Sequence, residues 1–307
     1  MLESDGTTGT LAWLDTSSTA GPDTLTETAI SVPGATTMVY DSNLNRLYIP
    51  GGQQLTIVDA SQSSPQVLAS PAIPPVPGVP PVNASAVAVA ALPDGSRAYV
   101  ASVPTAAQSS QISISGVMGD GTNATYTYTL TGGHDLTPGI SVLVSGVTPI
   151  EFDGTFTVES VSNSVAGTTC EQPTSNCTFQ AANTNTVAQT AVDPPGMASS
   201  TIDNLFPQVS VVNVSSNSIT KTLGIPGFPD ATVAGSPYYM PICASTRFRF
   251  MMAAGGDSNR AYLSTCDGGN VNFIDTTTNT YFQNLPAPPG SRPNNPPQNP
   301  VFLLAGP

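Results

Sequence analysis

The stretch NRLYIPGGQQLTIVDAS, residues 45–61, decides the fold prediction, because it reads as two short strands joined by a Gly-Gly turn. Its first half belongs to a pattern that recurs in DSNLNRLYI (41–49), PDGSRAYV (93–100) and GDSNRAYL (256–263). In each copy a polar turn precedes Arg, a small or apolar residue, Tyr and an aliphatic residue. Side chains alternate along a strand, so Arg and Tyr share one face and the apolar pair shares the other. Bulk on both faces predicts a strand between two packed layers.

A second pattern, apolar-x-apolar-apolar-Asp/Asn-x-Ser/Thr, occurs in LAWLDTS (11–17), LTIVDAS (55–61), VSVVNVS (209–215) and VNFIDTT (271–277). Its closing polar residue can bond its own backbone and start a turn. An apolar segment precedes each Arg-x-Tyr strand, and a further strand follows each second pattern. One unit is therefore predicted to be a four-stranded antiparallel meander. The spacing of Asp15 and Asp59 falls within the roughly 40–50 residues of a propeller blade.

These motifs resemble the secreted YVTN-type β-propeller repeat proteins. The resemblance rests on MVYDSNLNRLYI, VAALPDGSRAYVAS, VSVVNVSSNSITKTL and NPVFLLAGP, and it covers most of the chain outside residues 110–200. It implies an all-β propeller and is nearly silent on activity. Such proteins look like seven-bladed rings, whereas this chain offers four second-pattern strands and three Arg-x-Tyr strands. The alternative fold is a plain β-sandwich.

The unequal strand numbers leave three arrangements open, because the first blade lacks its opening strands. The C-terminal strand NPVFLLAGP can join residues 9–31 and close a ring of about four blades, the lower limit of the architecture. The chain can also be the C-terminal part of a larger ring. In the third arrangement the terminal strand pairs with a neighbouring molecule, a head-to-tail contact that builds open filaments. The Pro-rich stretches 69–83 and 285–300 are expected to pack on other structure rather than to stay free coils, and a neighbouring molecule is one candidate.

The predicted domains are residues 1–109 (propeller blades, first part), 110–200 (an inserted module) and 201–307 (propeller blades, second part, with a Pro-rich C-terminal arm). The insert breaks the repeat between the second and third strands of one blade. Its segments GGHDLTPGISVLVSG and FDGTFTVESV resemble small FCCH-type β-barrel modules, which occur in surface and phage-tail proteins. The expected fold is thus an all-β propeller with an inserted small β-barrel.

The composition excludes several classes of partner. Charged residues make up 9% of the 307 residues, against roughly 25% in an average soluble protein. Seven basic and 20 acidic residues give a net charge of −13, which repels phosphate backbones and anionic membranes. No apolar run reaches the ~18 residues of a spanning helix, so membrane insertion is not expected. No signal peptide follows Met1, so we expect a mature or truncated form of a secreted protein.

The cysteines and sequons point to an extracellular or cell-surface location. Four cysteines allow three pairings, of which neighbour with neighbour is preferred, Cys170 with Cys177 and Cys243 with Cys266. Free thiols in a cytosolic protein are the alternative. No Cys-x-x-Cys spacing supports zinc. Glycosylation candidates are the sequon residues Asn83, Asn123, Asn176 and Asn213.

The sequence offers no catalytic, cofactor or metal site. His134, the only histidine, sits beside Asp135 in a turn without a nucleophile near it in sequence. Glu151 and Asp153 read as solvated turn carboxylates rather than a glycosidase pair. Turn capping, rather than calcium binding, is expected of the aspartates in the repeat turns, Asp41, Asp94 and Asp257. Propeller lactonases draw His, Glu, Asp and Arg from several blades, which this chain does not match.

Two functional hypotheses follow. The first is a non-enzymatic extracellular structural or assembly protein that self-associates head to tail, into a filament or surface layer, through terminal strands. The second is a cell-surface module that binds carbohydrate or protein partners, since sparse charge with scattered Tyr and Asn suits such contacts. Neither requires a cofactor.

Overall fold

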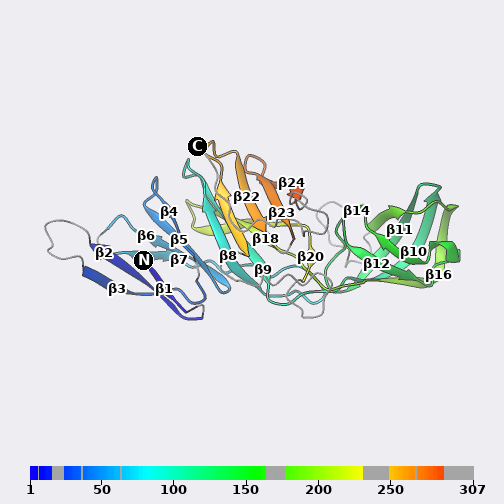
Figure 1. The fold of residues 1–307 in the computed structure, drawn as a ribbon, viewed down its shortest axis with the longest axis horizontal. Coiled ribbons are helices and arrows are strands. Elements are labelled where there is room, and N and C mark those ends of the chain that lie inside the picture. Colours follow the sequence, from blue (N-terminus) through cyan, green and yellow to red (C-terminus); the bar gives the residue numbers. More distant parts are fainter. Residues whose placement is uncertain are drawn as a thin grey trace, which may run out of the picture.

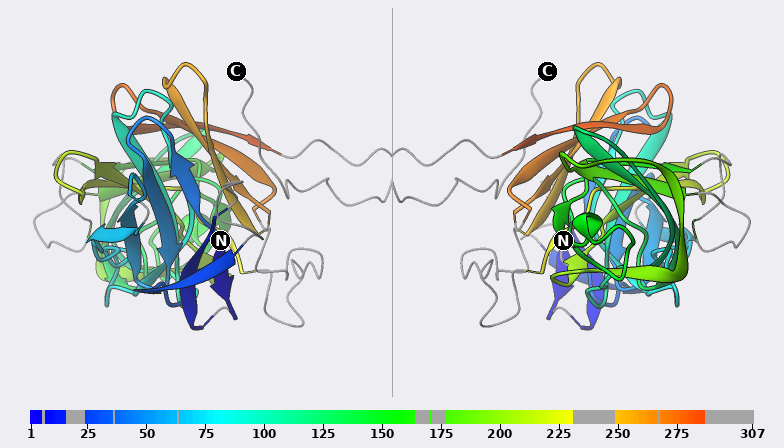
Figure 2. Two further views of the ribbon diagram at one scale, coloured as in Figure 1. Left: turned by 90° about the vertical axis from the view of Figure 1, so that its left-hand side faces the viewer. Right: turned by 90° about the vertical axis from the view of Figure 1, so that its right-hand side faces the viewer.

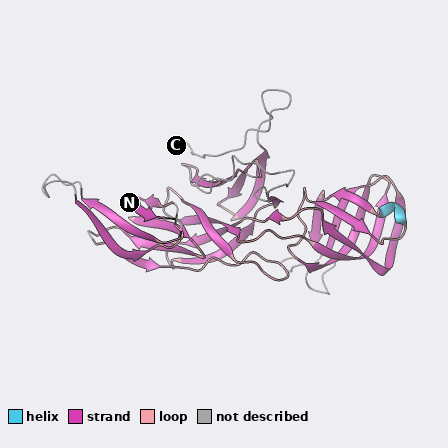
Figure 3. Ribbon diagram, turned by 60° about the horizontal axis from the view of Figure 1, so that its bottom comes forward, coloured by secondary structure: helices cyan, strands magenta, loops and turns pink. Residues whose placement is uncertain are grey.

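The computed structural model is built almost entirely from β-strands (Figures 1 and 3), with a single-turn 3-10 helix, η1 (Ile150–Phe152). It describes residues 1–5, 7–15, 24–35, 37–62, 64–163, 170, 177–230, 249–266 and 268–286. Four small sheets form one part of the molecule. A seven-stranded sheet forms the other, at the opposite end of the long axis from β1–β3 (Figure 1).

Four meander-like sheets, here called sheets 1 to 4, follow the predicted repeat. Sheet 1 has the order β1 (Leu2–Ser4), β2 (Gly9–Asp15), β3 (Thr24–Ser31). Sheet 2 has the order β4 (Val39–Asp41), β5 (Arg46–Gly51), β6 (Gln54–Asp59), β7 (Gln66–Ala69). Sheet 3 has the order β8 (Ala84–Ala91), β9 (Arg97–Pro104), β18 (Gln208–Asn213), β19 (Ser218–Gly224). Sheet 4 has the order β21 (Phe250–Ala254), β22 (Arg260–Thr265), β23 (Asn270–Asp275), β24 (Thr280–Pro286).

The register inside these sheets is the same in each repeat. The Arg that begins the second strand lies opposite the Asp or Asn that closes the third strand, in the pairs Arg46–Asp59, Arg97–Asn213 and Arg260–Asp275. The second and third strands of each sheet therefore form a hairpin whose open end carries this polar pair. The apolar residues between the open end and the turn face the neighbouring sheets. The predicted all-β, propeller-like fold class is confirmed.

The sheets bury alternate sides against one another, as bulk on both faces predicts. In β5, Ile49 packs toward sheet 1, in a cluster with Leu11 and Val32. Tyr48, one position earlier, packs in the cluster that includes Val89 and Val100 of sheet 3. Sheet 3 repeats the arrangement, because its other side packs on sheet 4. This third cluster contains Tyr99, Val209 and Val211 of sheet 3 and Met252 and Leu263 of sheet 4. Non-directional burial of apolar area is thus the main force that stacks the sheets.

One expectation needs correction. Sheet 1 does not lack a second strand, since β1 pairs with β2 from Leu2 to Ser4. The Pro-rich stretch 69–83 is packed, as expected, and it packs on the chain itself: Ile73 and Val76 are buried in the shared core, and Gln208 Nε2 donates to the Pro74 carbonyl at 2.5 Å. Residues 287–307, with the C-terminal strand and most of the Pro-rich arm, lie outside the described residues, so their pairing stays a prediction.

The insert is one curled sheet. Its order is β13 (Gly154–Thr157), β12 (Ser141–Ser145), β16 (Thr186–Ser200), β10 (Gln111–Asp120), β11 (Asn123–Gly132), β15 (Cys177–Ala182), β14 (Ser160–Asn163). Figure 2 (right) shows these strands curling around a common interior. The interior holds Tyr126 stacked on Phe179 at 4.6 Å between ring centroids. The end strands β13 and β14 are not paired with each other in the described sheet, so the inserted small β-barrel that we expected takes the form of a curled half-barrel.

A short junction ties the insert to the stacked sheets. Val79, in the Pro-rich stretch, exchanges two backbone hydrogen bonds with Gly133, of 2.7 and 2.9 Å. A second backbone pair joins Gln108 to Asn204, where the strand pair β17 (Asn204–Leu205) and β20 (Phe228–Pro229) begins. The junction works because Gly133 has φ +73 and no side chain beside the Ser109 carbonyl. The insert is thereby held by backbone contacts as well as by the core.

Replacing Gly133 by alanine tests this junction. A Cβ there would lie 1.4 Å from the Ser109 carbonyl oxygen, so the pairing with Val79 has to break. Gly139→Ala is the control, because Gly139 also has positive φ (+92) but nothing lies within 4 Å of its Cβ position. We expect backbone strain to lower the free energy of unfolding of both variants by about 1–2 kcal/mol. Gly133→Ala is expected to lose about 2 kcal/mol more from overlap, measured by urea unfolding. Equal losses would contradict the junction.

Candidate interface on the outer face of sheet 4

Two arginines reach from their own sheet to the next one. Arg46 of sheet 2 donates from Nη1 to the Val214 carbonyl at 2.5 Å and to Asn217 Oδ1 at 3.0 Å, both in sheet 3. Arg97 of sheet 3 repeats these bonds on sheet 4, to the carbonyl of Thr276 and, at 3.3 Å, to Asn279 Oδ1. We call this arrangement the arginine clamp. Hydrogen bonds from a charged donor are stronger than neutral ones, so the clamp favours one alignment of adjacent sheets.

The acceptors of the clamp are built by a local turn. In sheet 3, Asn213 Oδ1 accepts from the backbone N–H groups of Ser215 and Ser216, at 2.9 and 3.1 Å. In sheet 4, Asp275 Oδ1 accepts from Thr277 and Thr278 at 2.8 and 3.2 Å. These bonds, the side-chain bond from Thr277 foremost, lower the pKa of Asp275. Each turn ends on an asparagine at positive φ: Asn217 (φ 49) in sheet 3 and Asn279 (φ 51) in sheet 4. Asparagine tolerates that conformation better than most residues, which explains its place here.

The tyrosine of each Arg-x-Tyr strand packs beside the clamp. Tyr48 and Tyr99 are both fully buried by the following sheet, and burial raises the pKa of each phenol. The Tyr99 hydroxyl donates to Asn279 Oδ1 at 2.6 Å, so one asparagine receives both Arg97 and Tyr99. The Tyr48 hydroxyl is buried without a hydrogen-bond partner in the described structure. The Arg and Tyr of one face together therefore recognise the next sheet.

Sheet 4 carries the same pair without a following sheet. Arg260 bonds only within its own sheet in the described structure: Nη1 donates to the Asn259 carbonyl and lies 3.3 Å from Asp275 Oδ2. Its guanidinium also sits 5.4 Å from the ring centroid of Phe282. Tyr262 is half-buried, in contrast to the fully buried Tyr48 and Tyr99. In the described part of the chain, the apolar cluster that includes residues of sheet 1 contains residues of sheet 2 and none of sheet 4. The described sheets thus form an open arc.

The side of sheet 4 that carries Arg260 is mainly apolar. Cross-strand pairing places Ala253, Tyr262 and Phe273 in one row on this side, and Met251, Ser264 and Val271 in the next. Ser264 is fully buried and the other five are half-buried, whereas Ala261 and Leu263 on the opposite side are buried against sheet 3. We call this side the outer face; it is defined by Met251, Ala253, Arg260, Tyr262, Val271 and Phe273. It corresponds to the faces of sheets 2 and 3 that the following sheet covers.

The first sheet has the complementary free side. Leu11 packs toward sheet 2, so its neighbours Thr10 and Ala12 point away from it. Glu3 pairs with Thr10, and Glu27 pairs with Ala12, which places both carboxylates on that same side. Glu3 is half-buried and Glu27 is exposed. The two ends of the arc therefore differ in charge, because Arg260 at one end is paired with Asp275, whereas the other end carries two glutamates.

The predicted site residues lie apart from the outer face. Cys170 and Cys177 form a disulfide within the insert. Cys266 is also part of a disulfide, and Cys243 lies outside the described residues, so its pairing stays a prediction. Of the sequons, Asn83 and Asn213 are exposed, Asn123 is half-buried, and Asn176 lies outside the described residues.

The polar residues considered for catalysis hold turns. The ring of His134 stacks on Phe206 at 3.7 Å, and its Nδ1 lies 2.8 Å from the Asp135 carbonyl oxygen. Asp153 accepts from the backbone of Gly146 and Val147 at 2.9 and 2.8 Å, while Glu151 is exposed. The repeat aspartates each accept from a backbone N–H two residues on, in the bonds Asn43 to Asp41, Ser96 to Asp94 and Asn259 to Asp257. In the described residues no three His, Cys, Asp or Glu side chains gather as a metal site.

Sequence reasoning missed the clamp acceptors. The signal was present, since NVSSN (213–217) and DTTTN (275–279) place an asparagine four residues after the closing Asn or Asp. Within the residues that the structure describes, no helix is long and apolar enough to cross a membrane.

Comparisons with known proteins add little. No family model matches the chain, and no curated protein matches it. Among solved structures, a functionally unknown protein from Desulfotomaculum acetoxidans DSM 771 is similar with TM-score 0.25 and 10% identity over 85% of this chain. A protein from Lactobacillus plantarum has TM-score 0.25 and 14% identity over 93% of this chain. The chain spans 62% and 64% of the length of these two proteins.

A third similarity is to apo AztD from Citrobacter koseri, with TM-score 0.20 and 8% identity over 93% of this chain and 82% of that one. TM-scores this low support no statement about the function of this chain.

The arginines provide a matched pair for testing the clamp. Arg97→Ala leaves the Thr276 carbonyl and Asn279 without their charged donor, and we expect the free energy of unfolding to fall by about 1.5–3 kcal/mol. Arg260→Ala removes one half-exposed ion pair, for which we expect a loss below about 1 kcal/mol. Urea unfolding in dilute protein measures both. Similar losses in the two variants would show that the contact between sheets is not what Arg97 stabilises.

His134 predicts a pH dependence that can be assigned to one residue. Burial lowers the pKa of His134 in the folded protein, whereas in the unfolded chain it titrates near its ordinary value of about 6.5. The unfolded state therefore binds more protons as the pH falls through about 6.5, and stability decreases there. We expect the thermal midpoint to drop between about pH 7.5 and 5.5. His134→Phe keeps a ring over Phe206 and should remove this drop; an unchanged drop would assign it elsewhere.

Proposed function

We propose that this chain is a non-enzymatic, extracellular structural protein that assembles head to tail through the two ends of its open arc. The outer face of sheet 4 carries this proposal. The same Arg-Tyr face binds the following sheet twice within the chain, and its third copy has no following sheet in the described structure. The contact between sheets joins unlike faces, so a second molecule would supply its sheet 1. Repetition of such a heterologous contact produces a filament when it does not close.

The charges at the two ends support this pairing. Arg260 lies on the outer face, while Glu3 and Glu27 lie on the free side of sheet 1. The apolar row of Ala253, Tyr262 and Phe273 would supply most of the burial. The glutamates favour a contact with the end that carries Arg260 over a contact between two copies of sheet 1, which would bring glutamate against glutamate.

The remaining parts of the proposal concern location and family. The disulfide Cys170–Cys177 suits an oxidising, extracellular setting, and the exposed sequon residues Asn83 and Asn213 are accessible to glycosylation. The repeated register of the Arg-x-Tyr strands supports a YVTN-type repeat protein, and the curled insert supports an FCCH-like module. The scarcity of clustered acid and base groups in the described residues is the reason to prefer assembly over a lactonase-like activity.

A charge exchange tests the assembly. Sedimentation velocity across a wide range of protein concentrations is expected to show growing oligomers for the natural chain. Arg260→Glu and Glu27→Arg should each yield monomers, since each places like charges across the contact. The double variant should regain oligomers, because the opposite charges then face each other again.

Glu151→Arg is the control, since it makes the same change at an exposed site on the insert. It should leave the oligomers unchanged. A natural chain that stays monomeric at every concentration would overturn the proposal, and so would single variants that assemble like the natural chain.

A further inference from the structure

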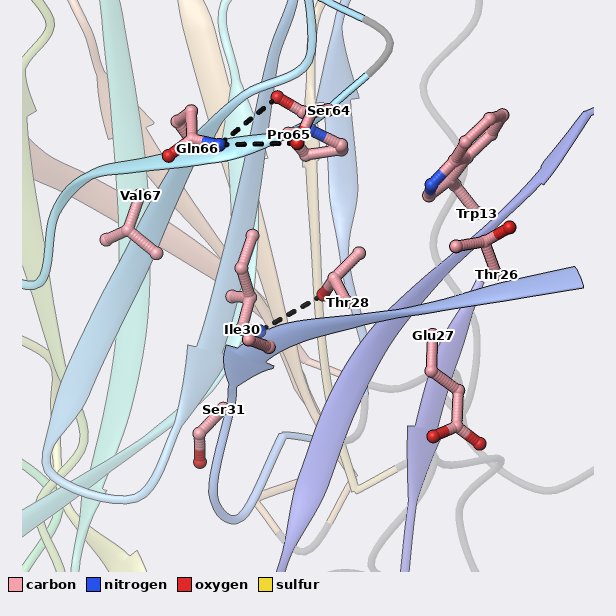
Figure 4. A pocket seen from close by; sticks show the side chains of 11 residues that line it. Trp13, Thr26, Glu27, Thr28, Ile30, Ser31, Ser64, Pro65, Gln66 and Val67 are labelled. Atoms are coloured by element: carbon pink, nitrogen blue, oxygen red, sulfur yellow. Dashed lines mark hydrogen bonds between the residues drawn. The ribbon is translucent and has the colours of Figure 1, made fainter.

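A groove opens between sheets 1 and 2, at the side of their outer strands β3 and β7 (Figure 4). Its volume is about 530 Å³, within the range of roughly 300–1,000 Å³ that small-molecule sites occupy. Trp13 and Thr26 stand on the wall formed by sheet 1, and Pro65, Gln66 and Val67 form the opposite wall. Sheets 2 and 3 lie between the groove and sheet 4, which carries the outer face.

Trp13 marks the groove as different from the other contacts between sheets. It lies two residues before the closing Asp15, the position that Ile57 holds in β6 and Val211 holds in β18. Ile57 and Val211 are buried, at 0% and 2% exposure, whereas Trp13 is half-buried. In sheets 2 and 3, whose faces the following sheet covers, this place holds a buried aliphatic side chain, whereas sheet 4 has the half-buried Phe273 there. In sheet 1 a large ring occupies the place, and part of the indole is left accessible to a ligand.

Several polar groups on the groove are not used by the protein. The indole N–H of Trp13 points toward the groove and makes no hydrogen bond in the described structure (Figure 4). A buried or half-buried indole N–H normally has a partner. The Gln66 amide makes only long bonds within its own loop, of 3.4 and 3.5 Å, to Ser64. The hydroxyls of Thr26 and Ser31 make none there. The groove therefore offers donors and acceptors to a polar ligand.

The electrostatics of the groove disfavour anionic ligands. Among the described residues no Lys or Arg lines it, and its one carboxylate, Glu27, extends away from Trp13 and Ser64 (Figure 4). The net charge of the chain is −13, which disfavours anions further. A neutral ligand that combines a flat apolar side with hydroxyl groups matches an indole flanked by hydroxyl and amide groups. A sugar ring has this chemistry.

We infer that the groove binds a neutral oligosaccharide, with one sugar ring stacked on the Trp13 indole. The indole N–H and the Gln66 amide then hydrogen-bond sugar hydroxyl groups, and the Thr26 hydroxyl bonds a second hydroxyl or the ring oxygen. Ile30 and Val67 contact the apolar side of the neighbouring ring. Of the residues that the proposed assembly uses, only Glu27 also borders the groove, and its carboxylate extends away from Trp13.

The experiment uses the fact that Trp13 is the only tryptophan, so its fluorescence reports on this groove alone. The probes are cellopentaose, chitopentaose, mannopentaose and maltopentaose, added to the full chain. We expect at least one probe to produce a saturable change in emission. Gln66→Ala should weaken its binding at least about tenfold, a loss of the size expected when one hydrogen-bonding group is removed. Gln62→Ala, an exposed glutamine of the same loop outside the groove, should bind normally.

Trp13→Phe, measured by calorimetry, keeps an aromatic ring but loses the N–H, and should also weaken binding. Circular dichroism melting confirms that each variant is folded. The absence of a saturable change with all four probes would overturn the inference, as would binding that neither Gln66→Ala nor Trp13→Phe alters. Arg260→Glu should bind the sugar like the natural chain, so a failure of the assembly proposal is distinguishable from a failure of this one.

Discussion

The hydrogen bonds that Arg46 and Arg97 make to the turns of the following sheet are the constraint on which the order of the stack depends. Apolar burial supplies most of the free energy that holds the sheets together, but it is non-directional and would tolerate many alignments. The clamp acceptors occur at one end of each sheet, in the turn between its third and fourth strands. A guanidinium that must reach a carbonyl and an asparagine there fixes both the register and the direction of stacking.

That direction has a structural consequence. Each of the two clamp contacts joins the Arg-Tyr face of one sheet to the opposite face of the next, so a row of such sheets always has two unlike ends. A closed ring removes the ends, whereas an open arc keeps them. In the described structure the ends are sheets 1 and 4, which carry glutamates and an arginine respectively. The asymmetry that orders the sheets within one molecule is thus also available for ordering several molecules.

The sequence predicted what is local and missed what depends on distant segments. The strands around Tyr48, Tyr99 and Tyr262 follow from alternation and turn chemistry, both of which act over a few residues. The partners of the arginines do not, because Arg46 and Val214 are 168 residues apart in the chain, with the insert between them. Alternation predicts the strands of the inserted β-barrel but not whether its end strands pair, so the half-barrel form could not be predicted. Trp13 was read only as a strand residue, since its exposure depends on how two sheets diverge.

The proposed assembly contact and the proposed saccharide groove lie on different parts of the molecule, so both can be occupied at the same time. An end-to-end contact would cover the free side of sheet 1 and the outer face of sheet 4, while the groove between sheets 1 and 2 opens beside the outer strands β3 and β7. Assembly would therefore repeat the groove along the filament without closing it. Weak sites at regular intervals on one particle bind a polymer more tightly than a single site does, because each bound site raises the effective concentration of the next. A groove that binds one saccharide weakly would then suffice to hold a filament on a surface rich in that saccharide.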